Sequence, residues 1–172
     1  MNSPKLPEPW LRGTLAEVDP VQRAVLHALE LAKEDLQKWC GDLSDEELNA
    51  SPGAAAPVAF HLRHIARSTD RLLTYAENRP LSPEQIAAMK QELDPAATRE
   101  ALFAELHRGL QSAAERILAI PPERLPETRV VGRQQLPTTV AGLVIHVGDH
   151  AQRHVGQGIT TAKIVKSRRA ST

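Results

Sequence analysis

The chain has 172 residues, and its 21 Lys and Arg side chains balance 21 Asp and Glu, so the formal net charge is zero. This length suits one domain with its own hydrophobic core, and the lack of a basic excess argues against nucleic-acid binding. The single cysteine excludes an internal disulfide framework, and no apolar run reaches the roughly 18 residues that span a membrane. Aromatic residues make up only 3%, whereas the helix formers Ala, Leu, Glu and Arg are frequent.

A first helix is predicted to begin at Asp19 and Pro20, because Asp is a favourable N-cap and Pro is favoured at the first helical position. Gly41 is expected to end this helix. Its apolar residues recur at alternating steps of four and three, which is the period of a helix in a bundle. They are Val25, Leu29, Ala32, Leu36 and Trp39.

Five more segments follow along the chain. The same spacing of apolar residues predicts long helices over about 57–78 and 97–119, and a capping pattern at Ser82 predicts a short helix between them. Residues 123–137 are the least helical part and favour an extended, hairpin-like excursion. A last helix is predicted from about 137 to 165.

These elements predict an all-α fold, a four-helix bundle over residues 19–166 with one short extra helix and long connections. Residues 1–18 contain three prolines and predict an irregular arm, which we expect Trp10 and Leu11 to anchor onto the bundle. Residues 167–172 form a short basic tail. The first residues lack the apolar core of a signal peptide, so we expect a cytoplasmic protein.

Three of the seven histidines recur at every fourth residue of the last predicted helix: His146, His150 and His154. On a helix this spacing places the imidazoles on one face, one turn apart. Neutral imidazole is the commonest transition-metal ligand, and two such rings can share one divalent ion. Because eight residues span about 12 Å of helix axis, all three rings cannot easily reach one ion. His150 belongs to both possible pairs.

A second pair, His61 and His64, lies on the helix predicted over 57–78. The helical wheel places His61 closer to the centre of the apolar stripe, so periodicity alone favours His61 as the inward ring. The sequence has neither the Glu-x-x-His pairs of di-iron bundles nor the His-Glu-x-x-His motif of zinc proteases. A site of three histidines with open positions is typical of catalytic zinc rather than structural zinc. Cys40 is expected to be an inert buried thiol.

Residues 58–68 and 150–157 together resemble the DinB-like (DinB/YfiT-like) superfamily of metalloenzymes, through His64 followed by Ile and Ala and through His150, His154 and the Gly-Gln that follows. The resemblance implies a four-helix bundle with a divalent ion, Zn²⁺ or Ni²⁺, near one end. It implies His64, His150 and His154 as the metal ligands. His61 and His146 then become neighbours of the ligands.

The resemblance also implies a function. Family members of known activity are often transferases or isomerases that use a low-molecular-weight thiol such as bacillithiol or mycothiol. We therefore expect a metal-dependent, thiol-dependent S-transferase or isomerase that acts on a small molecule, as a homodimer, in a pocket closed by residues 79–96 and 120–137. The alternatives are a metal-dependent hydrolase and a non-catalytic metal-binding or dimerising bundle. Neither nucleic acid nor a membrane is expected as a partner.

Overall fold

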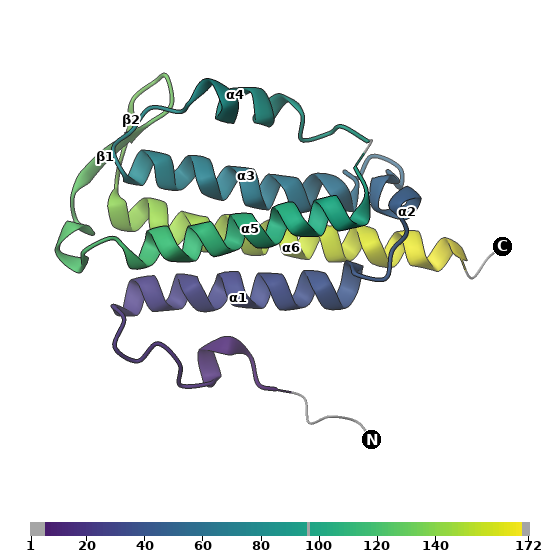
Figure 1. Cartoon of the computed structure of the whole chain (residues 1–172), viewed down its shortest axis with the longest axis horizontal. Coiled ribbons are helices and arrows are strands. Elements are labelled where there is room, and N and C mark those ends of the chain that lie inside the picture. The colour runs from purple at the N-terminus through teal and green to yellow at the C-terminus, as the bar shows by residue number, and fades with distance from the viewer. Residues whose placement is uncertain (1–5, 96, 170–172) are drawn as a thin grey trace.

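Four long helices lie side by side in the computed structural model, which describes residues 6–95 and 97–169 (Figure 1). The all-α prediction is confirmed, since the only strands in the described part form one small hairpin. None of the described helices is both long enough and apolar enough to cross a membrane. The long helices are α1 (Pro20–Cys40), α3 (Val58–Ala76), α5 (Arg99–Leu118) and α6 (Val140–Arg169).

Short elements occupy the connections. The helix α4 runs across the outer side of α3 and is not part of the bundle (Figure 1). The short elements are the 3-10 turns η1 (Pro9–Leu11) and η2 (Pro122–Arg124), the helices α2 (Asp45–Asn49) and α4 (Pro83–Lys90), and the strands β1 (Thr128–Val131) and β2 (Leu136–Thr139).

The strands explain why the last helix begins later than the sequence predicts. β1 and β2 pair antiparallel, with Thr128 opposite Thr139 and Val131 opposite Leu136. Residues 136–139 therefore belong to a hairpin, and α6 begins at Val140 rather than near Pro137. The pattern over 123–137 predicts this extended excursion, but it does not show how far the second strand extends.

Local capping determines where several helices begin. The Asp19 carboxylate accepts a hydrogen bond from the backbone N–H of Val21 at 2.9 Å, with Pro20 at the first helical position. Ser82 and Gln85 form a reciprocal capping box at the start of α4, because each side chain bonds to the other residue's backbone N–H. Thr98 accepts from a backbone N–H at the start of α5 in the same way. These contacts satisfy N–H groups that have no partner within the helix.

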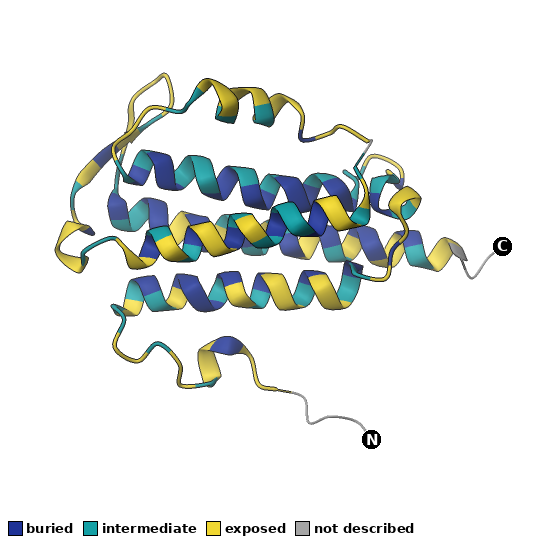
Figure 2. Ribbon diagram, in the orientation of Figure 1, coloured by how far each residue is buried: buried dark blue, intermediate teal, exposed yellow. Residues whose placement is uncertain are grey.

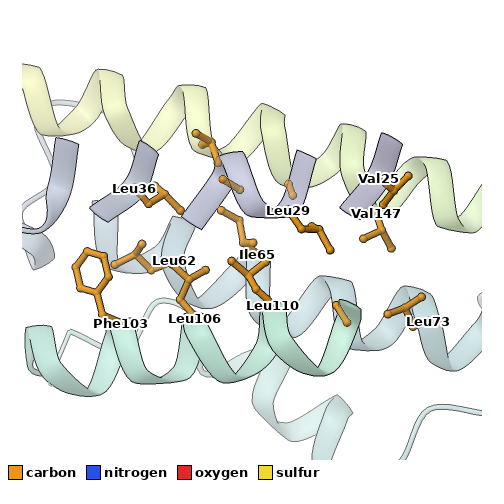
Figure 3. Packing of buried hydrophobic residues seen from close by; sticks show 14 of the residues in the cluster. Val25, Leu29, Leu36, Leu62, Ile65, Leu73, Phe103, Leu106, Leu110 and Val147 are labelled. Carbon is orange, nitrogen blue, oxygen red and sulfur yellow. The ribbon is translucent and has the colours of Figure 1, made fainter. Parts of the chain in front are cut away.

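The apolar faces of the long helices meet in one continuous core (Figures 2 and 3). Figure 3 shows α1 and α5 directing side chains towards the α3 residues Leu62 and Ile65. Leu36, Leu62, Ile65 and Leu106 are all completely buried. Burying a side chain of this size contributes about 1.5–3 kcal/mol, so this core is the main source of stability for the bundle.

The N-terminal arm is attached differently from the prediction. Trp10 and Leu11 are 61% and 56% exposed, so they do not anchor the arm. Arg12 attaches it instead, because its guanidinium donates to the Glu30 and Glu34 carboxylates of α1 at 2.7–2.8 Å. Surface ion pairs stabilise by at most about 1 kcal/mol each, and the buried Pro9 and the packing of Leu15 and Val18 against the core add to the attachment.

Helices α3 and α5 approach each other closely at Gly109. A Cβ at this position would lie 2.7 Å from the Cβ of Ala66 and 3.0 Å from its Cα. Neither atom can move without shifting a helix backbone. We expect Gly109→Ala to destabilise the protein by about 1–3 kcal/mol, although alanine is the better helix former by about 1 kcal/mol.

Gly156 provides the matched control for this prediction. It also lies inside a long helix, but a Cβ there would meet no atom within 4 Å. Gly156→Ala should therefore leave stability unchanged or raise it by up to about 1 kcal/mol. Urea unfolding of both variants measures the difference, and equal stabilities would show that the α3–α5 contact is not tight.

Candidate metal centre

Three imidazoles from two helices converge between α3 and α6. His64 comes from α3, and His150 and His154 come from successive turns of α6. Each offers a ring nitrogen, and these three nitrogens all lie within 4.8 Å of one another. The Nε2 atoms of His64 and His150 are 2.8 Å apart. This cluster could hold a metal ion. It lies two turns into α3 and near the middle of α6 rather than at one end of the bundle.

The surroundings keep two of these rings neutral. Burial, together with the nearby histidines and Arg153, lowers the pKa of His150 and of His154 to about 4. Neutral imidazole keeps a lone pair for a metal, whereas protonated imidazole does not. His150 Nδ1 is also buried without a hydrogen-bond partner in the described part of the chain. Protein atoms alone therefore do not satisfy this ring, which fits a site that receives a further group.

His61 lies beside the cluster and is 4% exposed. Its Nδ1 is 3.0 Å from the Nδ1 of His154, so one of these nitrogens donates a hydrogen bond to the other. Because this contact uses Nδ1 of His154, Nε2 is the ring nitrogen of His154 that remains for another partner. Burial, then His154 and His64, lower the pKa of His61 to about 4. His61 thus orients His154 from the interior of the bundle, as the helical wheel indicates for a more inward ring.

His146 lies one turn before His150 on the rim of the cluster. Its side chain is 46% exposed, and its ring centroid is 5.4 Å from that of His150. The nearest acidic group is the Asp149 carboxylate, whose Oδ2 lies 3.6 Å from His146 Nδ1. An exposed ring in this position can line the approach to the cluster, but it is not among the three that meet.

Glu92 is the residue of the site that the sequence does not reveal. Its carboxylate places Oε2 2.6 Å from His64 Nδ1 and Oε1 2.8 Å from Arg71 Nη1, and its side chain is 7% exposed. Although burial opposes the charge, hydrogen bonds from His64 and Arg71 lower the pKa of Glu92. Glu92 follows α4 in an irregular turn, where no periodic pattern marks which side chain points inward.

Two cavities flank the cluster. The larger, of about 690 Å³, is lined by residues 54–56 and by Phe60, His61, Arg153 and Gln157, among others. The smaller, of about 280 Å³, is lined by His64, Ser68, Arg71, Leu72, Tyr75, Leu81, Met89, His146 and His150.

These linings correct part of the predicted pocket. Leu81 and Met89 of the predicted segment 79–96 do line the smaller cavity, but no residue of 120–137 lines either cavity. The β hairpin lies instead at the end of the bundle where α6 begins (Figure 1). The loop before α3 takes the place predicted for 120–137.

Cys40 lies outside this site. It is completely buried in the core, and burial raises the pKa of its thiol to about 12. The thiolate is the reactive form of cysteine, so Cys40 is an inert core residue at neutral pH. Any thiol that reacts at the histidine cluster must come from a second molecule.

Comparison with known proteins identifies the family of this chain. A family model of the DinB superfamily matches residues 28–157, a range that contains all three clustered histidines and Glu92. A search of curated proteins finds no match to this chain. The family match covers most of the chain and the four-helix arrangement supports it, so the chain belongs to the DinB superfamily.

Proposed function

We propose that this protein is a metalloenzyme that binds Zn²⁺ or Ni²⁺ through His64, His150 and His154 and transfers a low-molecular-weight thiol to a small electrophile. One observation carries the proposal: three ring nitrogens from two helices lie within 4.8 Å of one another. A set of three nitrogen ligands leaves at least one position of a divalent ion open. An open position is what distinguishes a catalytic site from a closed structural one.

Thiol chemistry suits such a site. A bound divalent cation favours the deprotonated form of a thiol, and the thiolate is the nucleophile. The protein contributes the arrangement of the ligands: Glu92 bonds to His64, and His61 bonds to His154. The chain supplies no thiol of its own at the cluster, since its single cysteine is buried elsewhere.

The larger cavity is the proposed substrate site. At about 690 Å³ it is in the range of small-molecule pockets, and His61 connects its wall to the cluster. Arg153 and Gln157 on α6 supply a cation and an amide along the lining, while Phe60 supplies an apolar ring. This combination suits a molecule that carries a carboxylate and an apolar part.

The proposal is tested by metal analysis and activity together. Purified protein is assayed for bound metal and then for consumption of an added thiol with a model electrophile, before and after chelator treatment. Metal-dependent thiol consumption supports the proposal. Metal-dependent ester cleavage without thiol would replace it with hydrolysis. Stoichiometric metal without turnover of either kind would indicate the non-catalytic bundle.

A homodimer is also part of the proposal. A shallow apolar groove runs between α1 and α6, lined by Val21, Ala24, Ala28 and Ile145, and Ile145 is 52% exposed. Exposed apolar surface of this kind is common at subunit contacts. The mass in solution, measured by light scattering, decides between one and two copies, and Ile145→Lys should shift a dimer towards monomer.

A further inference from the structure

Three arginines on α3 connect this helix to the segment that covers it. They lie at steps of four, on one face: Arg63, Arg67 and Arg71. The first donates to the backbone carbonyl of Asp94. Arg67 donates to the carbonyl of Ala88 at 2.6 Å, and Arg71 donates to the Glu92 carboxylate at 2.8 Å. The arginines therefore fix the end of α4 and the turn after it against the bundle.

Apolar burial contributes little to this attachment. No residue of α4 is buried, and Ile86 and Met89 are 43% and 46% exposed. Figure 2 shows the exposed surface of α4 beside the buried faces of the bundle helices. The segment is held mainly by polar contacts, and its most buried polar residue is Glu92, whose side chain is 7% exposed. Burying a carboxylate costs free energy unless its oxygens are bonded.

Both Glu92 oxygens are used, each by a different partner. Oε1 accepts from Arg71, and Oε2 lies 2.6 Å from His64 Nδ1. A carboxylate can only accept, so Nδ1 of His64 must carry the hydrogen. The lone pair of the neutral ring then lies on Nε2, the atom that faces His150 at 2.8 Å. Glu92 thus selects the tautomer of His64 that a metal at the cluster would need.

We propose that Glu92 is a positioning residue, delivered by the α4 segment, which fixes the tautomer and orientation of His64 for metal binding. This inference rests on the proposed function, because the position of His64 matters only if the cluster binds metal. The hydrogen bonds of Glu92 to His64 and Arg71 do not depend on that function. Carboxylate partners of metal-bound histidines typically contribute 10–100-fold to metal affinity. Because linkage is reciprocal, a bound metal should in turn hold the α4 segment more firmly against α3.

A matched control separates this role from that of an ordinary ion pair. Glu105 on α5 accepts from Arg67 at 2.6 Å, but it makes no contact with any histidine of the cluster. Glu105→Ala removes one ion pair of the same arginine face and leaves His64 with its partner. Glu92→Ala removes both the ion pair and the tautomer selection.

The first measurement needs no metal. Nitrogen-15 NMR of the imidazoles in chelator-treated protein reports which nitrogen of His64 carries the hydrogen. We expect the Nδ1–H form in the unaltered protein and in Glu105→Ala, and a shift towards Nε2–H in Glu92→Ala. An Nε2–H tautomer in the unaltered protein would overturn the proposal, whether or not the protein binds metal.

The second measurement is affinity for Zn²⁺, by competition with a chromophoric chelator. Glu92→Ala should weaken binding by about 10–100-fold, and Glu105→Ala by less than about threefold. Glu92→Gln keeps the length of the side chain and an oxygen that can accept from Nδ1–H of His64, so it should retain part of the affinity that Glu92→Ala loses. It also replaces Glu92→Ala in the measurement if that variant does not fold. Equal losses in Glu92→Ala and Glu105→Ala would overturn the proposal. A loss in Glu92→Gln as large as that in His150→Ala would also overturn it, since Glu92 would then be a ligand.

Discussion

Replacing His150 with alanine is expected to lower the affinity for Zn²⁺ or Ni²⁺ by about 100–1000-fold. Structural zinc sites with four ligands bind with about 10–16 kcal/mol, so one ligand contributes about 3–4 kcal/mol, and each 1.4 kcal/mol is a factor of ten. The ring of His150 packs against those of His64 and His154, with centroids 5.0 and 4.6 Å away, and its Nε2 is 2.8 Å from that of His64. Its removal leaves two rings, which cannot hold the ion alone. Competition titration with a chromophoric chelator measures the change.

His146→Ala is the control for this experiment. His146 is one helical turn from His150, but its side chain is 46% exposed and it lies outside the three-histidine cluster. We expect its replacement to change affinity by less than about threefold. Loss of binding in His146→Ala with retention in His150→Ala would contradict the assignment, because His150 belongs to both possible pairs on α6.

The metal-free protein should lose stability as the pH falls from 6.5 to 4.5. The folded state lowers the pKa of His61, His150 and His154 from 6.5 to about 4. In this window the unfolded chain binds protons that the folded chain does not, so the stability that is present above pH 6.5 declines on acidification. We expect a loss of about 2 kcal/mol by pH 4.5, much less than three full shifts, because the rings keep part of their contact with water.

Carboxylates do not produce the same effect in this window. Glu92 and Glu127 have a lowered pKa, so the stability they contribute is present above their ordinary value of 4.5 and declines only below it. Urea unfolding at pH 8, 6.5, 5.5 and 4.5, after chelator treatment, measures the curve. His154→Gln removes one of the titrating rings and should flatten it. Stability that stayed constant or rose between pH 6.5 and 4.5 would contradict the expectation.

The helices could be predicted because their signals are local. Apolar residues at steps of three and four mark the buried face of α1, and Asp19, Pro20 and Gly41 mark its ends. The start of α6 could not be placed because it depends on pairing between β1 and β2, which brings together residues on opposite sides of a turn. The exposure of Trp10 was also beyond prediction, since an arm without periodicity does not indicate which side chain faces the body.

The candidate site was predictable in part. Spacing on α6 brought out His146, His150 and His154 without deciding between the two pairs, and periodicity favoured His61 over His64. The structure gives a basis for each choice: His61 is the more buried ring, whereas His64 lines the smaller cavity and its Nε2 faces that of His150. An apolar stripe identifies the centre of the core, and an open site belongs at its edge. The assignment of His64, His150 and His154 as ligands stays a prediction.

The origin of the three rings on two distant helices has a consequence for folding. His64 and His150 are 86 positions apart in the chain of 172 residues, so an ion shared between them would act as a reversible cross-link that closes a loop of half the chain. In the unfolded polypeptide, only His150 and His154 would remain close together in sequence, and two rings bind an ion weakly. A cation present at about 1000 times its dissociation constant would therefore raise the unfolding free energy by about 4 kcal/mol, and the melting temperature would report the cellular supply of that cation.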